Sequence, residues 1–96
     1  MKVVTICGSM KFTKEMYDIA GMLELERNYC VLQPVYDLPE MTEEQYKNII
    51  ALHYKKIDIS DAIYVINING YIGESVRNEI EYAKSKNKEV IYHEKI

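Results

Sequence analysis

The residues best suited to chemistry lie between Gly73 and Ile80, where the chain reads Gly-Glu-Ser-Val-Arg-Asn-Glu-Ile. The glycine and serine predict the start of a helix, whose free N–H groups and positive dipole end favour an anion such as phosphate. One turn further on, Glu79 lies beside the apolar positions Val76 and Ile80. Because burial of an unpaired charge is costly, we interpret Glu79 as a nucleophile or base in a pocket wall. The alternative is a surface glutamate paired with a neighbour.

A second short loop, Cys7-Gly8-Ser9-Met10, follows the first predicted strand. Glycine lets a backbone approach a ligand closely, and a serine hydroxyl can bind an oxyanion. Gly8, Ser9, Gly73 and Ser75 are therefore candidate substrate- or phosphate-binding residues. Gly8 and Ser9 also suit an ordinary strand-to-helix turn, and Ser75 an ordinary N-cap. The phosphate-loop and G-x-G-x-x-G patterns are absent from the sequence, which argues against a typical NTPase or dinucleotide site.

The histidines and cysteines show no pattern typical of a metal site. His53 lies on the apolar stripe of a predicted helix, either as a packed core residue or as a proton donor. His53 and His93 are the two histidines of the chain, and their spacing is not that of metal ligands. We expect Cys7 and Cys30, both in predicted strands, to be buried thiols of a reducing compartment. The sequence thus predicts no metal and no cofactor.

Length and composition indicate one globular domain over residues 1–96. The net charge of −3 argues against nucleic-acid binding, which needs a basic surface. A long apolar run and a signal-peptide pattern are absent from the sequence, so we expect no membrane interaction and a cytoplasmic protein. A chain of this size buries only roughly 60–65% of its unfolded surface. Together with nine tyrosines, this favours a homo-oligomer, most simply a dimer.

The elements that must position these residues alternate between strand and helix. Apolar, β-branched runs predict strands at residues 3–7, 29–32, 62–66 and 90–92. Helices are predicted from about residue 13, from a capping box formed by Thr42 and Gln45, and over residues 74–86. This alternation predicts an open, parallel, four-stranded sheet of order 2-1-3-4 with helices on both faces, a flavodoxin- or Rossmann-like sandwich. Ligands of such folds bind at the switch point between strands one and three, where the two loops meet.

Three short motifs resemble the nucleoside 2-deoxyribosyltransferase-like superfamily, which includes deoxyribosyltransferases and small nucleoside 5′-monophosphate N-glycosidases. They are Ile6-Cys7-Gly8-Ser9, Ser60-Asp61-Ala62 and the Gly-x-Ser-x-x-x-Glu-Ile pattern that ends at Ile80. The resemblance implies the same open α/β fold, a dimer or higher oligomer, and a nucleoside or nucleotide as the small-molecule partner. It implies that Glu79 attacks the anomeric carbon to give a glycosyl–enzyme intermediate. It also implies that Gly8, Ser9, Gly73 and Ser75 hold the 5′ end or its phosphate.

The chain departs from that family pattern at several positions, including Glu81, where transferases usually carry glycine, and Gly73-Glu74-Ser75, where they have Asp-x-Gly. Two further departures concern the chemistry. Thr5 stands where the monophosphate hydrolases have tyrosine, and His53 stands where they have aspartate. His53 is therefore expected to replace the acid as proton donor to the leaving base, unless catalysis is lost and only the binding pocket is kept. The sequence leaves open an N-glycosidase or deoxyribosyltransferase, a non-catalytic nucleotide-binding or sensing module, and a small scaffold protein.

Overall fold

The computed structural model describes residues 1–95, and its centre is one parallel sheet. The strands are β1 (Val3–Cys7), β2 (Cys30–Leu32), β3 (Ala62–Val65) and β4 (Glu89–Tyr92), in the order β2-β1-β3-β4. Val4 of β1 pairs with Val31 on one side and with Ala62 on the other. The structure confirms the predicted strand order, with β1 and β3 adjacent at the centre.

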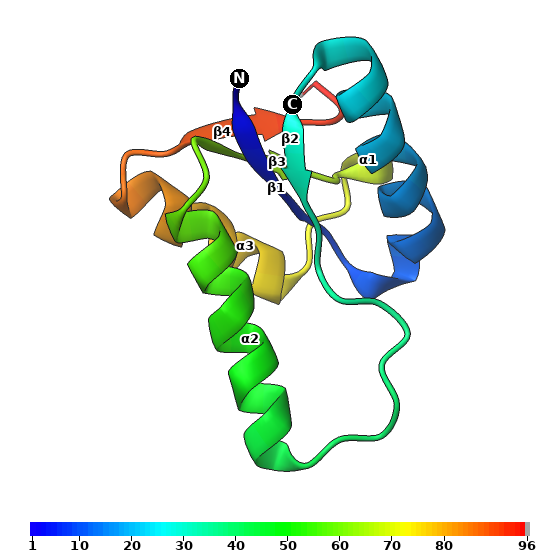
Figure 1. Ribbon diagram of the computed structural model, residues 1–96, viewed down its shortest axis with the longest axis vertical. Helices are drawn as coiled ribbons and strands as arrows, with labels where there is room; N and C mark the ends of the chain where they lie inside the picture. Colours follow the sequence, from blue (N-terminus) through cyan, green and yellow to red (C-terminus); the bar gives the residue numbers. More distant parts are fainter. Residues whose placement is uncertain (96) are drawn as a thin grey trace.

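Three helices cover the two faces of the sheet (Figure 1): α1 (Thr13–Arg27), α2 (Glu43–Asp58) and α3 (Glu74–Ser85). Single 3₁₀ turns, η1 (Met10–Phe12) and η2 (Ile68–Gly70), follow β1 and β3. α1 packs on one face, while α2 and α3 pack on the other, which gives the predicted three-layer Rossmann-like arrangement. Within residues 1–95, every helix is too short or too polar to span a bilayer.

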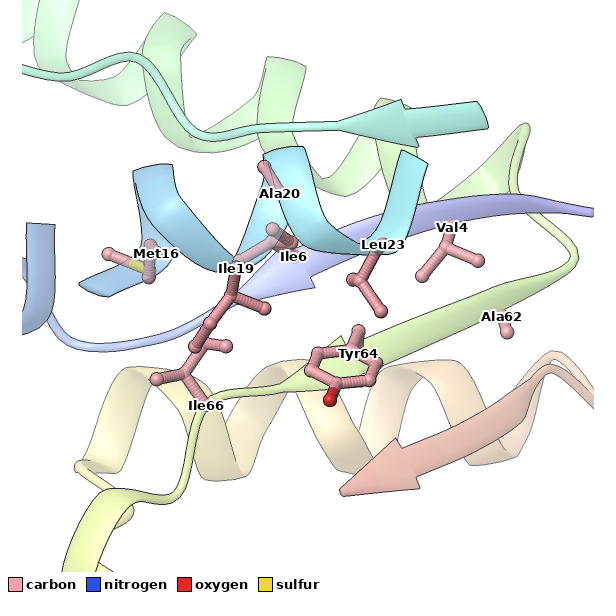
Figure 2. Close-up of a cluster of buried hydrophobic side chains, with 9 residues drawn as sticks. All are labelled: Val4, Ile6, Met16, Ile19, Ala20, Leu23, Ala62, Tyr64 and Ile66. Atoms are coloured by element: carbon pink, nitrogen blue, oxygen red, sulfur yellow. The ribbon is translucent and has the colours of Figure 1, made fainter. Parts of the chain in front are cut away.

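Alternation along β1 decides which side chains face which layer. Val4 and Ile6 point toward α1, as Figure 2 shows, and form one core cluster with residues of α1 and β3. Thr5 and Cys7 belong to the opposite face, because successive strand residues point to opposite sides. The α1-side cluster consists of Val4, Ile6, Met16, Ile19, Ala20, Leu23, Ala62, Tyr64 and Ile66.

The second core cluster lies between the sheet and the helices α2 and α3. Cys7 is fully buried in it, and Val76 and Ile80 provide the apolar side of α3. Ile57 is the one fully buried residue of α2. The remaining members are Ile63, Val65 and Ala83.

Hydrogen bonds link the C-terminal end of α2 to β1. The buried Thr5 Oγ1 lies 2.6 Å from Ser60 Oγ and 3.0 Å from the carbonyl oxygen of Lys56. Asp61 accepts a hydrogen bond of 2.8 Å from the backbone N–H of Val3, so it links the turn before β3 to the start of β1. Because the last turn of α2 is anchored here, His53, one turn earlier, is brought over the sheet.

The N-terminal half of α2 differs from the packed helix that the sequence predicts. The capping box of Thr42 and Gln45 is present, but Tyr46 and Ile50 on the apolar stripe remain 55% and 42% exposed. This half of the helix extends away from the sheet, reached by the long connection after β2 (Figure 1). Its apolar stripe therefore lies uncovered in the single chain.

One prediction about the cysteines is wrong. Cys7 is buried, as expected, but Cys30 is exposed. The reason is topological: β2 is an edge strand and pairs only with β1, so a strand residue there lacks a neighbour on one side. Neither cysteine forms a disulfide in the described part of the chain.

Candidate functional site

A pocket of about 680 Å³ lies beyond the carboxyl ends of β1 and β3, at the switch point of the sheet. The loop after β1 and the first turns of α3 form one side, and α2 forms the other. The six residues that the sequence identified all line this pocket: Gly8, Ser9, His53, Gly73, Ser75 and Glu79. Folding thus brings together segments that are as far apart in the chain as Gly8 and Glu79.

Glu79 and His53 are in direct contact in the pocket wall. The Oε1 atom of Glu79 lies 3.4 Å from Nε2 of His53, and the two side chains are 14% and 12% exposed. Glu79 reaches this position because Val76 and Ile80 are buried in the core beside it on α3. The carboxylate is therefore held at the pocket side of a packed helix, and its partner comes from α2.

Cys7 is a third polar group at this point, although the sequence predicted only that it would be a buried thiol. Its Sγ atom lies 3.7 Å from Nε2 of His53. Burial raises the pKa of the Cys7 thiol well above its ordinary value, and the neighbouring negative charge of Glu79 raises this pKa further. The thiol is therefore protonated at neutral pH. Strand alternation is the sequence signal that places Cys7 on the α2–α3 face.

The polar contacts of the His53 ring are concentrated on one edge. Nε2 faces both Cys7 and Glu79, whereas the buried Nδ1 atom has no hydrogen-bond partner among the described residues. A buried polar atom without a partner costs stability. His53 therefore differs from a core histidine whose polar atoms are all hydrogen-bonded. Its ring lies beside two groups, Cys7 and Glu79, with which it can exchange a proton or bind a common ligand.

Gly8 and Ser9 have structural roles in addition to their place at the pocket. A Cβ atom on Gly8 would lie 2.7 Å from Sδ of Met16 and 2.9 Å from Cβ of Ile66, so the tight packing under the loop requires a glycine. The Ser9 hydroxyl accepts a hydrogen bond of 3.3 Å from the backbone N–H of Lys11 and caps η1. The loop is thus shaped by packing and capping as well as by any ligand.

The start of α3 differs from the N-cap expected at Ser75. The N-cap residue is Gly73, and no side chain caps the helix. Ser75 lies inside the first turn and is exposed. The uncapped first turn therefore meets the pocket, with Gly73, Glu74 and Ser75 in its wall, and its backbone N–H groups are suited to an anion.

Aromatic side chains complete the wall, and no pattern in the sequence distinguishes them from the other tyrosines of the chain. Tyr46, Tyr54 and Tyr71 line the pocket. The Nζ atom of Lys11 lies 3.4 Å from the ring centroid of Tyr71, a cation–π contact that holds this ring in place. Burial raises the pKa of the Tyr54 hydroxyl, and the charge of Glu79 adds to this effect.

A comparison of the chain with protein-family models, curated proteins and solved structures finds no significant match. The class that the fold and site define is an α/β protein with a pocket at the switch point of a parallel sheet. The function has to be argued from the chemistry of that pocket, because a fold of this type serves many functions.

Proposed function

We propose that the protein acts on the N-glycosidic bond of a nucleoside or nucleotide, as an N-glycosidase or deoxyribosyltransferase, with Glu79 as nucleophile. The observation that carries this proposal is the Glu79–His53 pair, 3.4 Å apart and largely removed from water, in the wall of a pocket of about 680 Å³. A pocket of this volume suits a small organic ligand, and a shielded carboxylate suits attack on a cationic sugar centre.

The proposed reaction has two steps. A carboxylate oxygen of Glu79 bonds to the anomeric carbon while the bond from that carbon to the base nitrogen breaks, and the electron pair leaves with the base, which takes up a proton. Water or a second base then displaces Glu79 from the sugar and loses a proton, which restores the carboxylate. The configuration at the anomeric carbon is retained, because each step inverts it once.

The position of His53 favours a role in orienting Glu79. In retaining glycosidases the nucleophile and the acid stand about 5–5.5 Å apart, so that the sugar fits between them. The contact between His53 and Glu79 is shorter, at 3.4 Å. A proton donation to the leaving base, as predicted from the sequence, requires His53 to separate from Glu79 when substrate enters.

The remaining pocket residues support a nucleotide as ligand. The uncapped first turn of α3, with Gly73 and Ser75 in the wall, offers N–H groups to a 5′-phosphate. Gly8 and Ser9 bound the same pocket. Tyr54 and Tyr71 of the wall offer aromatic rings on which a base can stack.

We further propose that the protein is a homodimer, joined through the N-terminal half of α2. Tyr46 and Ile50 are 55% and 42% exposed there. A short helix without a packing partner is marginal in water, and a second copy of the same apolar stripe is the simplest cover. A cytoplasmic location is consistent with the unpaired thiols of Cys7 and Cys30.

A non-catalytic nucleotide-binding module is the second candidate, and one observation favours it. The side chain at the position where the related hydrolases have tyrosine is Thr5, which is fully buried and bonded to Ser60 and Lys56. Thr5 therefore cannot provide a hydroxyl to the pocket. The side chains available for catalysis would then be Glu79 and His53 alone.

Incubation of the protein with a panel of nucleosides and their 5′-monophosphates distinguishes the two candidates. Chromatography measures the release of free base, and calorimetry measures binding of the same compounds. Base release that Glu79→Gln abolishes supports the enzyme. Binding of monophosphates without base release from any compound supports the binding module, and the absence of both results rejects the proposal.

A further inference from the structure

The contact of Glu79 and His53 has a third member, Cys7, which the proposed reaction does not use, and together the three groups form a donor set. Sγ of Cys7, Nε2 of His53 and a carboxylate oxygen of Glu79 all lie within 4.8 Å of one another. They come from β1, α2 and α3, so each is held by a different packed element. A convergence of thiol, imidazole and carboxylate is typical of transition-metal sites.

The distances between the donor atoms fit a tetrahedral ion. With Zn–S of about 2.3 Å and Zn–N and Zn–O of about 2.0–2.1 Å, neighbouring ligand atoms lie about 3.3–3.6 Å apart. The separations here are 3.4 Å between His53 and Glu79 and 3.7 Å between Cys7 and His53. The third separation, between Cys7 and Glu79, is at most 4.8 Å. A rotation of the Glu79 side chain would therefore bring this third distance into the range of the other two.

We propose that Cys7, His53 and Glu79 bind a Zn²⁺ ion, with its fourth coordination position open to the pocket. The chemistry of the donors selects this metal: thiolate and imidazole together favour Zn²⁺ over Mg²⁺ and Ca²⁺, which need oxygen ligands. Three protein ligands with one open position are the arrangement of catalytic zinc sites rather than of closed structural ones. The inference goes beyond the proposed function and does not depend on it.

Binding changes the protonation of the site. The thiol of Cys7 loses its proton to solvent as sulfur bonds to the metal, because a coordinated thiol is deprotonated. His53 binds through Nε2 and keeps its proton on Nδ1. Because Nδ1 has no protein acceptor among the described residues, the affinity is expected to be about 10- to 100-fold below that of a site with this outer hydrogen bond.

The metal and the proposed nucleophile compete for the same carboxylate. When Glu79 coordinates Zn²⁺, its lone pairs are no longer free to attack a sugar. If the proposed function holds, Zn²⁺ inhibits base release and a chelator restores it. Metal binding itself is measured without any substrate, so failure of the proposed function and failure of this inference are separate results.

Cobalt(II) is the probe that reads the ligands directly. The reduced, chelator-treated protein is titrated with Co²⁺, and a thiolate-to-cobalt charge-transfer band with tetrahedral d–d bands is expected at one ion per chain. Zn²⁺ in slight excess should remove these bands, whereas Mg²⁺ should not. Cys7→Ser should abolish the charge-transfer band, and Cys30→Ser, which alters the exposed cysteine, should leave it unchanged.

His53→Gln and Glu79→Gln provide tests that do not alter the fully buried Cys7. Each should weaken Co²⁺ binding by about 100-fold or more, since a direct ligand matters at least as much as an outer-shell partner. Circular dichroism verifies that every variant is folded. The proposal is overturned if the wild type shows no charge-transfer band in excess Co²⁺. It is also overturned if the band survives in Cys7→Ser and disappears in Cys30→Ser.

Discussion

Replacement of Glu79 by glutamine tests the proposed chemistry most directly. Glu79→Gln keeps the shape of the side chain and an oxygen that can accept a hydrogen bond from His53, but it removes the negative charge and the nucleophile. Because the fold and the contact with His53 are preserved, the variant should unfold at nearly the same urea concentration as the wild type and should still bind nucleotide.

The expected loss of activity follows from the position of Glu79. Its side chain is only 14% exposed, so an effective dielectric constant near 20 applies to its interaction with a cationic sugar. At a separation of about 4 Å, the electrostatic energy of that interaction is about 4 kcal/mol. A loss of about 4 kcal/mol of transition-state stabilisation corresponds to a rate about 10³-fold lower. The loss of the covalent intermediate adds to this figure, which is therefore a minimum.

The assay measures release of free base under single-turnover conditions, with Glu81→Gln as matched control. Glu81 lies two residues further along α3 and is exposed, and the same interaction in bulk water is worth only about 1 kcal/mol. Glu81→Gln should therefore change the rate by less than about tenfold. Full turnover in Glu79→Gln, or an equal loss in both variants, would refute the assignment of Glu79 as nucleophile.

Three further predictions concern the phosphate site, the dimer and the packing of the first loop. Gly73→Asp and Gly73→Asn each supply the missing side-chain N-cap of α3 and should raise the free energy of unfolding by a few tenths of a kcal/mol. The negative charge of the aspartate should weaken monophosphate binding at least about tenfold relative to asparagine, about 1.4 kcal/mol. Equal affinities of the two variants by calorimetry would reject a phosphate site there. Ile50→Lys should convert a dimer into monomers in sedimentation velocity, whereas Leu25→Lys, at an 89% exposed position of α1, should not. The dimer is contradicted if the wild type is monomeric at tens of micromolar, which is about ten times the concentration at which a complex of roughly −8 kcal/mol assembles. Gly8→Ala should lower the free energy of unfolding by about 1–3 kcal/mol, because the added Cβ atom overpacks against Met16 and Ile66. Gly21→Ala, whose Cβ atom would meet nothing within 4 Å, should raise the free energy of unfolding by about 0.5–1 kcal/mol, and urea unfolding measures both changes.

Much of the fold was predictable from the sequence because its signals are local. The β-branched run of β1 and the apolar spacing of α1 and α3 report buried faces directly. The Thr42–Gln45 capping box marks the start of α2 without any tertiary contact. Alternation of strand and helix then leaves few topologies, and the observed order β2-β1-β3-β4 is the one expected.

The pocket was predictable in part for the same reason. Parallel topology places the loops after β1 and β3 side by side, so residues such as Gly8 and Gly73 were expected at one site, and the structure brings them to one pocket. The position of Glu79 among apolar neighbours on α3 was a further local signal. Helix periodicity alone relates it to Val76 and Ile80, which are both buried.

By itself, then, the sequence determined the elements, their order in the sheet and the loops that meet at its edge, because these depend on periodicity and chain direction. Only the tertiary structure decided the distances between elements: Cys7, His53 and Glu79 converge because α2 is anchored through Thr5 and Ser60, and no spacing along the chain encodes that contact. Likewise, the same apolar pattern runs along the whole of α2, but only its last turns reach the sheet. Burial is a property of neighbours in space, and the edge position that exposes Cys30 is set by the rest of the fold.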